Sequence, residues 1–260
     1  MNQPLAYVHP QAKIASNVVI EPFVTIHKNV EIGEGTWIGS NVTIMEGARI
    51  GKNNKIFPGA VISAIPQDLK FEGEESLVKI GDNNIIREFV TINRGTKANM
   101  ETVIGNNNLL MAYCHIAHDC IVKNHCILAN AATLAGHITV EDWAIIGGLV
   151  AVHQFVTIGQ HTMISGGSLV RKDVPPYTKA AREPLSYVGI NSIGLRRRNF
   201  SPEKINEIQN IYRFLFLKNN NVTQAIRAIE AEMPATRERD EIISFITNSA
   251  RGIMRGYLKS

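Results

Sequence analysis

Cysteine is scarce in this chain of 260 residues, which contains only three. So few thiols exclude a disulfide-stapled scaffold and favour a reducing compartment or the absence of a redox role. No apolar run approaches the roughly 20 residues that a membrane-spanning helix requires. The first residues also lack the basic stretch and apolar run of a secretion signal. We therefore expect a cytoplasmic protein without stable membrane insertion.

Charge is modest but uneven. Charged residues make up 19% of the chain and hydrophobic ones 45%, with a net charge of +4, which indicates a globular protein. Residues 171–200 carry seven Lys and Arg against one Asp and one Glu. This segment is either a solvated face or a surface for an anionic ligand or an acidic protein. The pairs Gly147-Gly148 and Gly166-Gly167 precede no helical pattern, which argues against a dinucleotide-binding loop. We expect no nucleic-acid partner.

A six-residue repeat runs through about two thirds of the chain. From Val8 to Val170, 25 of the 28 positions spaced six apart are Ile, Leu or Val. This period is typical of a hexapeptide β-helix, a three-sided prism in which three hexads form each coil and about nine coils stack. A second column, four residues after each aliphatic, holds small residues and includes Cys114, Cys120 and Cys126. We therefore expect the cysteines to be interior fillers.

The repeat is interrupted twice and resumes in phase each time. Residues 63–79 and 97–103 lose the pattern, so we expect them to be loops thrown out of a coil. Long loops on a rigid scaffold commonly carry function. The first loop contains the polar cluster Gln67-Asp68-Leu69-Lys70, which suits a polar ligand.

The repeat gives way to a helical pattern near the C-terminus. Pro175-Pro176 should end the prism because proline cannot donate to a strand ladder, and a connector should follow to residue 200. Ser201-Pro202-Glu203 is typical of a helix start. Further helices are expected over 222–232 and 237–256. We divide the chain into a β-helix over 1–185 and a small α-helical domain over 186–260.

Several histidines lie on one side of the predicted prism. They are His118, His137 and His153 on consecutive coils, with His115 at the neighbouring corner and Gly136 and Gln154 in the column of His118. Such a cluster could bind zinc, perform acid–base catalysis or fill a structural role at a subunit interface. Asp119 suits a carboxylate that orients His118. Their contact requires a corner or bend, because neighbouring strand residues point to opposite faces. The others, His9, His27, His125 and His161, are expected to be ordinary surface residues.

A set of segments from both parts of the chain carries a family resemblance. They are Gln67-Asp68-Leu69-Lys70, Arg94-Gly95-Thr96, His115-Ile116-Ala117-His118-Asp119-Cys120, Leu134-Ala135-Gly136-His137, Ile145-Ile146-Gly147-Gly148, Ala151-Val152-His153-Gln154-Phe155, Asp173-Val174-Pro175-Pro176-Tyr177, and Gly194-Leu195 followed by three arginines. With the hexapeptide prism, they resemble the UDP-N-acetylglucosamine acyltransferases of lipid A biosynthesis. The resemblance covers nearly the whole chain.

The resemblance implies a left-handed β-helix and a specific reaction. A long-chain (R)-3-hydroxyacyl group moves from acyl carrier protein to the 3-hydroxyl of UDP-N-acetylglucosamine, which is the first step of lipid A biosynthesis. His118 is implied to be the general base, Asp119 its orienting partner and Gly136 the backbone N–H donor to the oxyanion. No metal or other cofactor is implied. Substrate contacts are implied for Asp68, Lys70, His115, His137, His153, Gln154, Asn191, Arg197 and Arg198. The family site lies between subunits of a homotrimer, and the acidic carrier protein would explain the basic segment.

Three positions bear on specificity. Gly166 occupies the position that measures acyl-chain length in the family, and a glycine there predicts a long donor. Ile193 replaces a glutamate of the family, so one nucleotide contact must differ. Asn93 replaces the histidine that usually precedes Arg-Gly-Thr, which puts any role of that residue in doubt.

Three alternatives remain at this stage. A related amino-sugar N-acyltransferase would use similar residues, because residue types do not show whether an amine or a hydroxyl is acylated. A γ-type carbonic anhydrase shares the prism and binds zinc through three histidines. A non-catalytic prism would serve as a scaffold.

Overall fold

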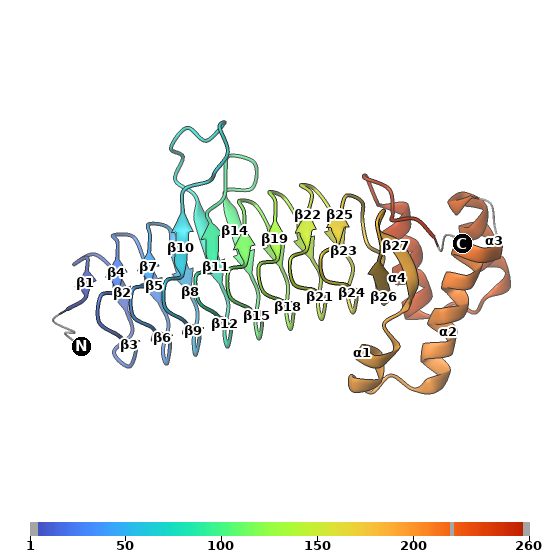
Figure 1. Ribbon diagram of the computed structural model, residues 1–260, viewed down its shortest axis with the longest axis horizontal. Coiled ribbons are helices and arrows are strands. Elements are labelled where there is room, and N and C mark those ends of the chain that lie inside the picture. Colours follow the sequence, from blue (N-terminus) through green and yellow to red (C-terminus); the bar gives the residue numbers. More distant parts are fainter. Residues whose placement is uncertain (1–4, 219–220, 257–260) are drawn as a thin grey trace.

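Stacked coils form a three-sided prism in the computed structural model, which describes residues 5–218 and 221–256 (Figure 1). Each coil contributes short strands to three sheets that run parallel along the prism. Strands one coil apart pair at an offset of 18 residues, as Tyr7 does with Thr25 and Thr133 with Ala151. The predicted parallel β-helix of hexapeptide repeats is confirmed.

The three sheets are numbered here in the order in which the chain meets them. The first contains β1 (Tyr7–Val8), β4 (Thr25–Ile26), β7 (Thr43–Ile44), β10 (Val61–Ala64), β13 (Thr91–Asn93), β16 (His115–Ile116), β19 (Thr133–Leu134), β22 (Ala151–Val152) and β25 (Leu169–Val170). The second contains β2 (Lys13–Ile14), β5 (Glu31–Ile32), β8 (Ala48–Ile50), β11 (Leu77–Ile80), β14 (Glu101–Ile104), β17 (Ile121–Val122), β20 (Thr139–Val140) and β23 (Thr157–Ile158). The third contains β3 (Val19–Ile20), β6 (Trp37–Ile38), β9 (Lys55–Ile56), β12 (Ile85–Ile86), β15 (Leu109–Leu110), β18 (Ile127–Leu128), β21 (Ile145–Ile146), β24 (Met163–Ile164), β26 (Thr178–Ala181) and β27 (Ser186–Ile190).

The turns between sheets form three corners along the prism. The first corner joins the first sheet to the second, the second corner joins the second to the third, and the third corner returns to the first sheet. Each corner therefore belongs to a different edge of the prism.

The aliphatic column of the repeat fills the interior. From Ile26 to Val170, the Ile, Leu and Val residues of the six-residue column are at most 4% exposed. Burying one such side chain contributes about 1.5–3 kcal/mol. Cys114, Cys120 and Cys126 are free and fully buried among them, as predicted. Burial raises the pKa of the Cys114 thiol to about 11, so it remains an unreactive filler at neutral pH.

Both breaks in the repeat form loops at the first corner. The chain leaves β10 and returns at β11, and it leaves β13 and returns at β14, on the same side of the prism (Figure 1). Val61 pairs with Thr91 at an offset of 30 residues, and Thr91 pairs with His115 at an offset of 24. Both offsets exceed one coil by whole hexads, which explains why the repeat resumes in phase.

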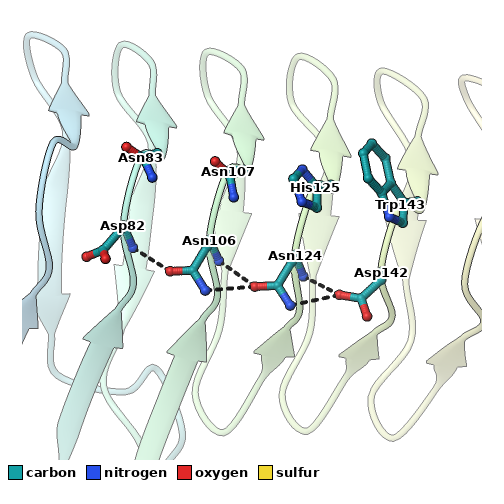
Figure 2. Close-up of a pocket in the computed structure, with 8 residues that line it drawn as sticks. All are labelled: Asp82, Asn83, Asn106, Asn107, Asn124, His125, Asp142 and Trp143. Carbon is teal, nitrogen blue, oxygen red and sulfur yellow. Dashed lines mark hydrogen bonds between the residues drawn. The ribbon is translucent and has the colours of Figure 1, made fainter. Parts of the chain in front are cut away.

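Amide side chains connect the coils at the second corner. In Figure 2, Asp82, Asn106, Asn124 and Asp142 occupy successive coils. The Nδ2 of Asn106 donates to Asn124 Oδ1 at 2.9 Å, and the Nδ2 of Asn124 donates to Asp142 Oδ1 at 3.0 Å. A second ladder inside the same corner contains Asn54, Asn84 and Asn108. These ladders satisfy polar groups that stacking removes from water.

The paired prolines do not end the prism, contrary to the prediction. β26 pairs in parallel with β24, so the third sheet continues beyond Pro175-Pro176. The prolines lie in the turn before β26, where a missing N–H costs no ladder bond. β27 returns antiparallel to β26, and α1 (Ser192–Arg197) follows it. The expected connector to residue 200 is therefore an ordered hairpin and a helix.

Helices pack on the C-terminal end of the prism (Figure 1). They are α2 (Pro202–Arg213), which continues into the π-helical η1 (Phe214–Lys218), then α3 (Val222–Glu232) and α4 (Arg237–Thr247). Ser201 caps α2 by accepting from the Lys204 N–H, as predicted. The bounds of α3 match the prediction. None of the helices in the described part of the chain has the length and apolar character needed to cross a membrane.

The last predicted helix is too long by about two turns. α4 ends at Thr247, after which the chain folds back onto the prism. The hydroxyl of Ser249 donates to Asp173 Oδ2 at 2.6 Å, and Ile253 forms a bridge with Asp173. The hydroxyl of Tyr212 on α2 donates to the Pro176 carbonyl at 2.5 Å. These contacts fix the helical part against the final coil.

Candidate active site

His118 and Asp119 lie in the turn of the first corner that follows β16. Asp119 has a φ of 59°, in the left-handed region that Asp and Asn tolerate better than most residues. The Nδ1 of His118 lies 2.8 Å from Asp119 Oδ2. The corner therefore brings together two neighbours whose side chains would diverge in a strand.

Asp119 is a buried carboxylate that remains ionised. Burial by itself raises its pKa, but hydrogen bonds from Thr96 and His118 and the nearby His137 together lower it below the ordinary value. An anionic acceptor holds the imidazole proton of His118 on Nδ1. With that proton on Nδ1, Nε2 is the ring nitrogen of His118 that faces away from Asp119, on a side chain that is 13% exposed.

Gly136 lies against the His118 ring on the next coil. A Cβ at Gly136 would lie 2.5 Å from Cε1 and 2.7 Å from Nε2 of His118. No side chain fits there without moving the imidazole. The structure thus places the two residues together, as the count of 18 residues per coil predicts.

Asp68 and His137 complete the immediate surroundings of His118. The first loop places Asp68 Oδ2 3.8 Å from His118 Nε2. The ring of His137 meets the His118 ring edge-on at 5.1 Å, and Phe155 stacks on His137 at 4.5 Å. Burial lowers the pKa of His137 despite the opposing charge of Asp119. His137 is therefore a neutral imidazole at pH 7.

The other predicted residues near this corner are less enclosed. His115 on β16 contacts Thr91 Oγ1 through Nδ1 at 2.7 Å, and burial lowers its pKa. Thr91 is not distinguishable in the sequence, because a threonine on a strand carries no signal of a contact with a histidine. His153, Gln154 and Lys70 are exposed, and His153 Nδ1 lies 3.2 Å from the Gln154 carbonyl oxygen.

Asn191, Arg197 and Arg198 lie elsewhere, around α1 at the second corner. Asn191 caps α1 and donates through Nδ2 to the His161 carbonyl at 2.9 Å. The Nη2 of Arg198 donates to the Trp143 carbonyl at 3.2 Å, and its guanidinium lies 5.0 Å from the indole centroid. Arg197 is exposed on the same helix. Trp143 likewise carries no signal in the sequence that would place it beside Arg198.

His161 is not the ordinary surface residue that was predicted. It is 8% exposed and packs against the rings of Tyr177 and Phe200 at centroid distances of 5.5 and 5.2 Å. Burial and the charge of Arg198 lower its pKa to about 4, so it is neutral at pH 7. The repeat places His161 on the outside of a coil, and only the folding back of the helical part buries it.

The three specificity positions have distinct settings. Gly166 is exposed at the third corner, where a Cβ would lie 3.0 Å from the Gly148 carbonyl oxygen. Ile193 is 62% exposed on α1. Asn93 is buried and donates through Nδ2 to the Ile65 carbonyl at 2.9 Å, which fastens the first loop at its base. Asn93 therefore has a structural contact whether or not it meets a substrate.

One group in the described part of the chain could gather metal-ligating atoms, namely His118, Asp119 and His137, which lie within 4.8 Å of one another. Asp119 Oδ2 already accepts from His118 Nδ1 and, at 2.6 Å, from the Thr96 hydroxyl. With Nδ1 of His118 directed at Asp119, only its Nε2 could reach a metal, and the group contains two imidazoles where the zinc hypothesis requires three. The arrangement suits proton transfer better than zinc binding by three histidines.

The chain matches known proteins along nearly its whole length. A family model described as Udp N-acetylglucosamine O-acyltransferase, domain 2, matches residues 173–254, and a bacterial transferase hexapeptide model matches 29–64 and 101–136. A relative from Thiobacillus denitrificans named acyl-[acyl-carrier-protein]--UDP-N-acetylglucosamine O-acyltransferase is 44% identical over 253 residues, 97% of this chain and 98% of the relative.

Solved structures give the same result for the fold. A UDP-N-acetylglucosamine acyltransferase from Bacteroides fragilis has a TM-score of 0.96 and 54% identity, covering 98% of this chain and 100% of that one. LpxA from Acinetobacter baumannii has a TM-score of 0.94 and 42% identity, covering 97% and 98%. The coils wind left-handed, as in those structures. The carbonic anhydrase and scaffold hypotheses thereby lose their support. This chain belongs to the family of UDP-N-acetylglucosamine O-acyltransferases that use acyl-acyl carrier protein as donor.

Proposed function

We propose that this protein transfers a long-chain (R)-3-hydroxyacyl group from acyl carrier protein to the 3-hydroxyl of UDP-N-acetylglucosamine, the first step of lipid A biosynthesis. One observation carries the proposal within this family. The His118 ring lies between two carboxylates, with Nδ1 2.8 Å from Asp119 Oδ2 and Nε2 3.8 Å from Asp68 Oδ2. This is the geometry of a general base that faces a polar acceptor. We expect the reaction to take place in the cytoplasm.

The proposed mechanism begins with proton transfer to His118. Nε2 takes the proton of the sugar 3-hydroxyl as the oxygen attacks the thioester carbonyl, and Asp119 stabilises the imidazolium that forms. The backbone N–H of Gly136 donates to the tetrahedral oxyanion. The C–S bond then breaks, and the proton passes from His118 to the departing phosphopantetheine thiolate. The mechanism uses no metal or other cofactor, since the carrier protein supplies the acyl group as a thioester.

We further propose that the site is shared between subunits of a homotrimer. Asp68, Lys70, His115, His137, His153 and Gln154 line the first corner and would hold the sugar and diphosphate. Asn191, Arg197 and Arg198 lie at the second corner and would hold the nucleotide. A strand of the second sheet separates the two corners on one chain, and a neighbouring subunit packed alongside would bring its second corner close to the first corner of this chain.

The basic segment is the proposed docking surface for the carrier protein. Arg171, Lys172, Lys179, Arg182 and Arg196 are exposed. Arg171 already pairs with Glu183 at 2.7 Å, whereas Lys172 and Lys179 project from the last coils. An acidic partner would be attracted to this surface, and its binding should weaken as salt increases.

The proposal is tested by an acyl-transfer assay with UDP-N-acetylglucosamine and hydroxyacyl carrier proteins of several chain lengths. We expect His118→Ala to lower kcat by about 10²–10⁴-fold, because a positioned general base contributes that much. Thermal unfolding of the variant should remain close to that of the native protein, which separates chemistry from folding. Near-native turnover by His118→Ala would show that another group is the base.

A further inference from the structure

We propose that Thr96, at the start of the second loop, is a positioning residue that fixes Asp119 and thereby the tautomer of His118. The inference rests on the proposed role of His118 as general base. It assigns a function to the second loop that the sequence pattern alone leaves open.

The second loop supplies most of the hydrogen bonds to the Asp119 carboxylate. The Thr96 hydroxyl donates to Oδ2 at 2.6 Å, and the Thr96 backbone N–H donates to Oδ1 at 3.0 Å. The Asn99 backbone N–H lies 3.3 Å from Oδ1. His118 supplies the fourth contact, from Nδ1 to Oδ2 at 2.8 Å. Two of the four donors therefore belong to Thr96, which is 9% exposed.

The loop that carries Thr96 is closed upon itself. The Met100 N–H donates to the Thr96 carbonyl at 2.7 Å. A Cβ on Gly95 would lie 2.2 Å from the Glu101 nitrogen, so only glycine allows the two arms of the loop to approach this closely. The hydroxyl of Ser76 donates to the Gly95 carbonyl at 2.5 Å. Thr96 is thus held independently of the carboxylate it contacts.

The same loop also holds the segment that carries Asp68. The Lys97 backbone N–H donates to Glu74 Oε1 at 3.0 Å, and the Lys97 ammonium pairs with Glu72. The two loops therefore form one clamp around the first corner. The second loop donates hydrogen bonds to Asp119 on the Nδ1 side of the His118 ring. The first loop places Asp68 on the Nε2 side of the same ring.

The hydroxyl of Thr96 has a specific chemical consequence. It occupies one side of Asp119 Oδ2, which leaves the other side directed at His118 Nδ1. A carboxylate without this donor can rotate or turn toward other donors, so the proton of the neutral imidazole can move to Nε2. A ring protonated on Nε2 cannot accept a proton there. Loss of the hydroxyl should therefore lower kcat and leave substrate binding largely intact.

The experiment compares Thr96→Val, which keeps the shape of the side chain, with Thr96→Ser, which keeps the hydroxyl. Two readouts are used, namely the acyl-transfer kinetics and the ¹⁵N resonances of His118, which distinguish a protonated from an unprotonated ring nitrogen. We expect Thr96→Val to lower kcat roughly tenfold with KM for UDP-N-acetylglucosamine nearly unchanged, as for loss of one hydrogen bond to a charged group. The Nε2-protonated tautomer should become detectable in the valine variant only.

Thr36→Val is the matched control, since Thr36 is also buried and its hydroxyl donates to the Gly51 carbonyl at 3.0 Å far from the site. It should lose comparable stability without any change in kcat. Thr96→Cys replaces the valine variant if that variant does not fold, and native kcat with either one would overturn the inference. Full activity of His118→Ala would instead refute the proposed base, while the His118 resonances would still show whether Thr96 fixes the ring.

Discussion

At the scale of single residues, several side chains of the site are positioned by left-handed backbone conformations, with positive φ, that most residues avoid. Asp119, His137 and Phe155 follow one another on consecutive coils, with φ values of 59°, 61° and 64°. Such conformations cost of order 1–3 kcal/mol each for residues other than glycine. Hydrogen bonds to the Asp119 carboxylate and the stacking of Phe155 on His137 offset that cost. Positive φ values recur at non-glycine residues along the whole prism, for example at Phe23, Asn53 and Trp143, so the site makes use of a backbone conformation that belongs to the coil turns in general.

Gly166 provides a test of donor specificity at this scale. Its surroundings are open apart from the Gly148 carbonyl oxygen, so a methionine side chain would project from the third corner. If the acyl chain passes this point, Gly166→Met should move the preferred donor toward shorter hydroxyacyl groups. Competition between carrier proteins of different acyl length measures the shift, and Leu149→Met at the same corner, where Leu149 is 72% exposed, is the control. An unchanged preference in Gly166→Met would contradict the role of this position as a ruler.

At the scale of elements, the repeat made the strands predictable and left the C-terminal hairpin unpredicted. Every sixth residue of a coil points into the narrow interior, where mainly aliphatic side chains fit. This column of aliphatic residues can be recognised from the sequence alone. β26 and β27 follow no such column, since their pairing is set by contact with the last coil and the helices. The C-terminal end of α4 cannot be predicted from the sequence for the same reason, because a contact with a distant part of the chain determines it. Ser249 contacts Asp173, which lies 76 residues earlier in the chain.

The amide ladder of the second corner gives a prediction about stability. Asn124 Oδ1 accepts from both the backbone and the side chain of Asn106, while its own Nδ2 donates to Asp142. Asn124→Ala should cost about 1–3 kcal/mol of unfolding free energy, because it leaves these partners unsatisfied. Asn124→Asp places a second carboxylate against Asp142 and should be worse at pH 7 than at pH 4, where protonation of one carboxyl supplies a donor. Thermal unfolding at both pH values tests this, and an equal deficit at both would show that the ladder is not electrostatically coupled.

At the scale of the whole molecule, the predicted site residues divide among different corners of one prism. Counting hexads is enough to bring His118, Gly136 and His137 together, because every coil has the same length. It does not place Asn191 or Arg198, since they reach the second corner only after the chain folds back from the prism end. For those residues the sequence offered a resemblance and no geometry. Their separation from His118 on one chain is the structural reason for proposing a shared site.

A shared site predicts that two inactive variants restore each other. His118→Ala disables the first corner, and the double variant Arg197→Ala, Arg198→Ala disables the second. When the two chains are co-expressed with different affinity tags, mixed trimers contain interfaces that join an intact first corner to an intact second corner. Every mixed trimer, whichever chain is present twice, contains one such interface among its three, so doubly purified trimers should regain about a third of native activity. The control pair is His118→Ala co-expressed with a chain that carries His118→Ala, Arg197→Ala and Arg198→Ala together. Mixed trimers of this pair should have no restored activity, because none of their chains retains His118. If the mixed trimers of the first pair remain as inactive as either parent, both corners must serve a site within one chain, and the proposed arrangement of subunits is wrong.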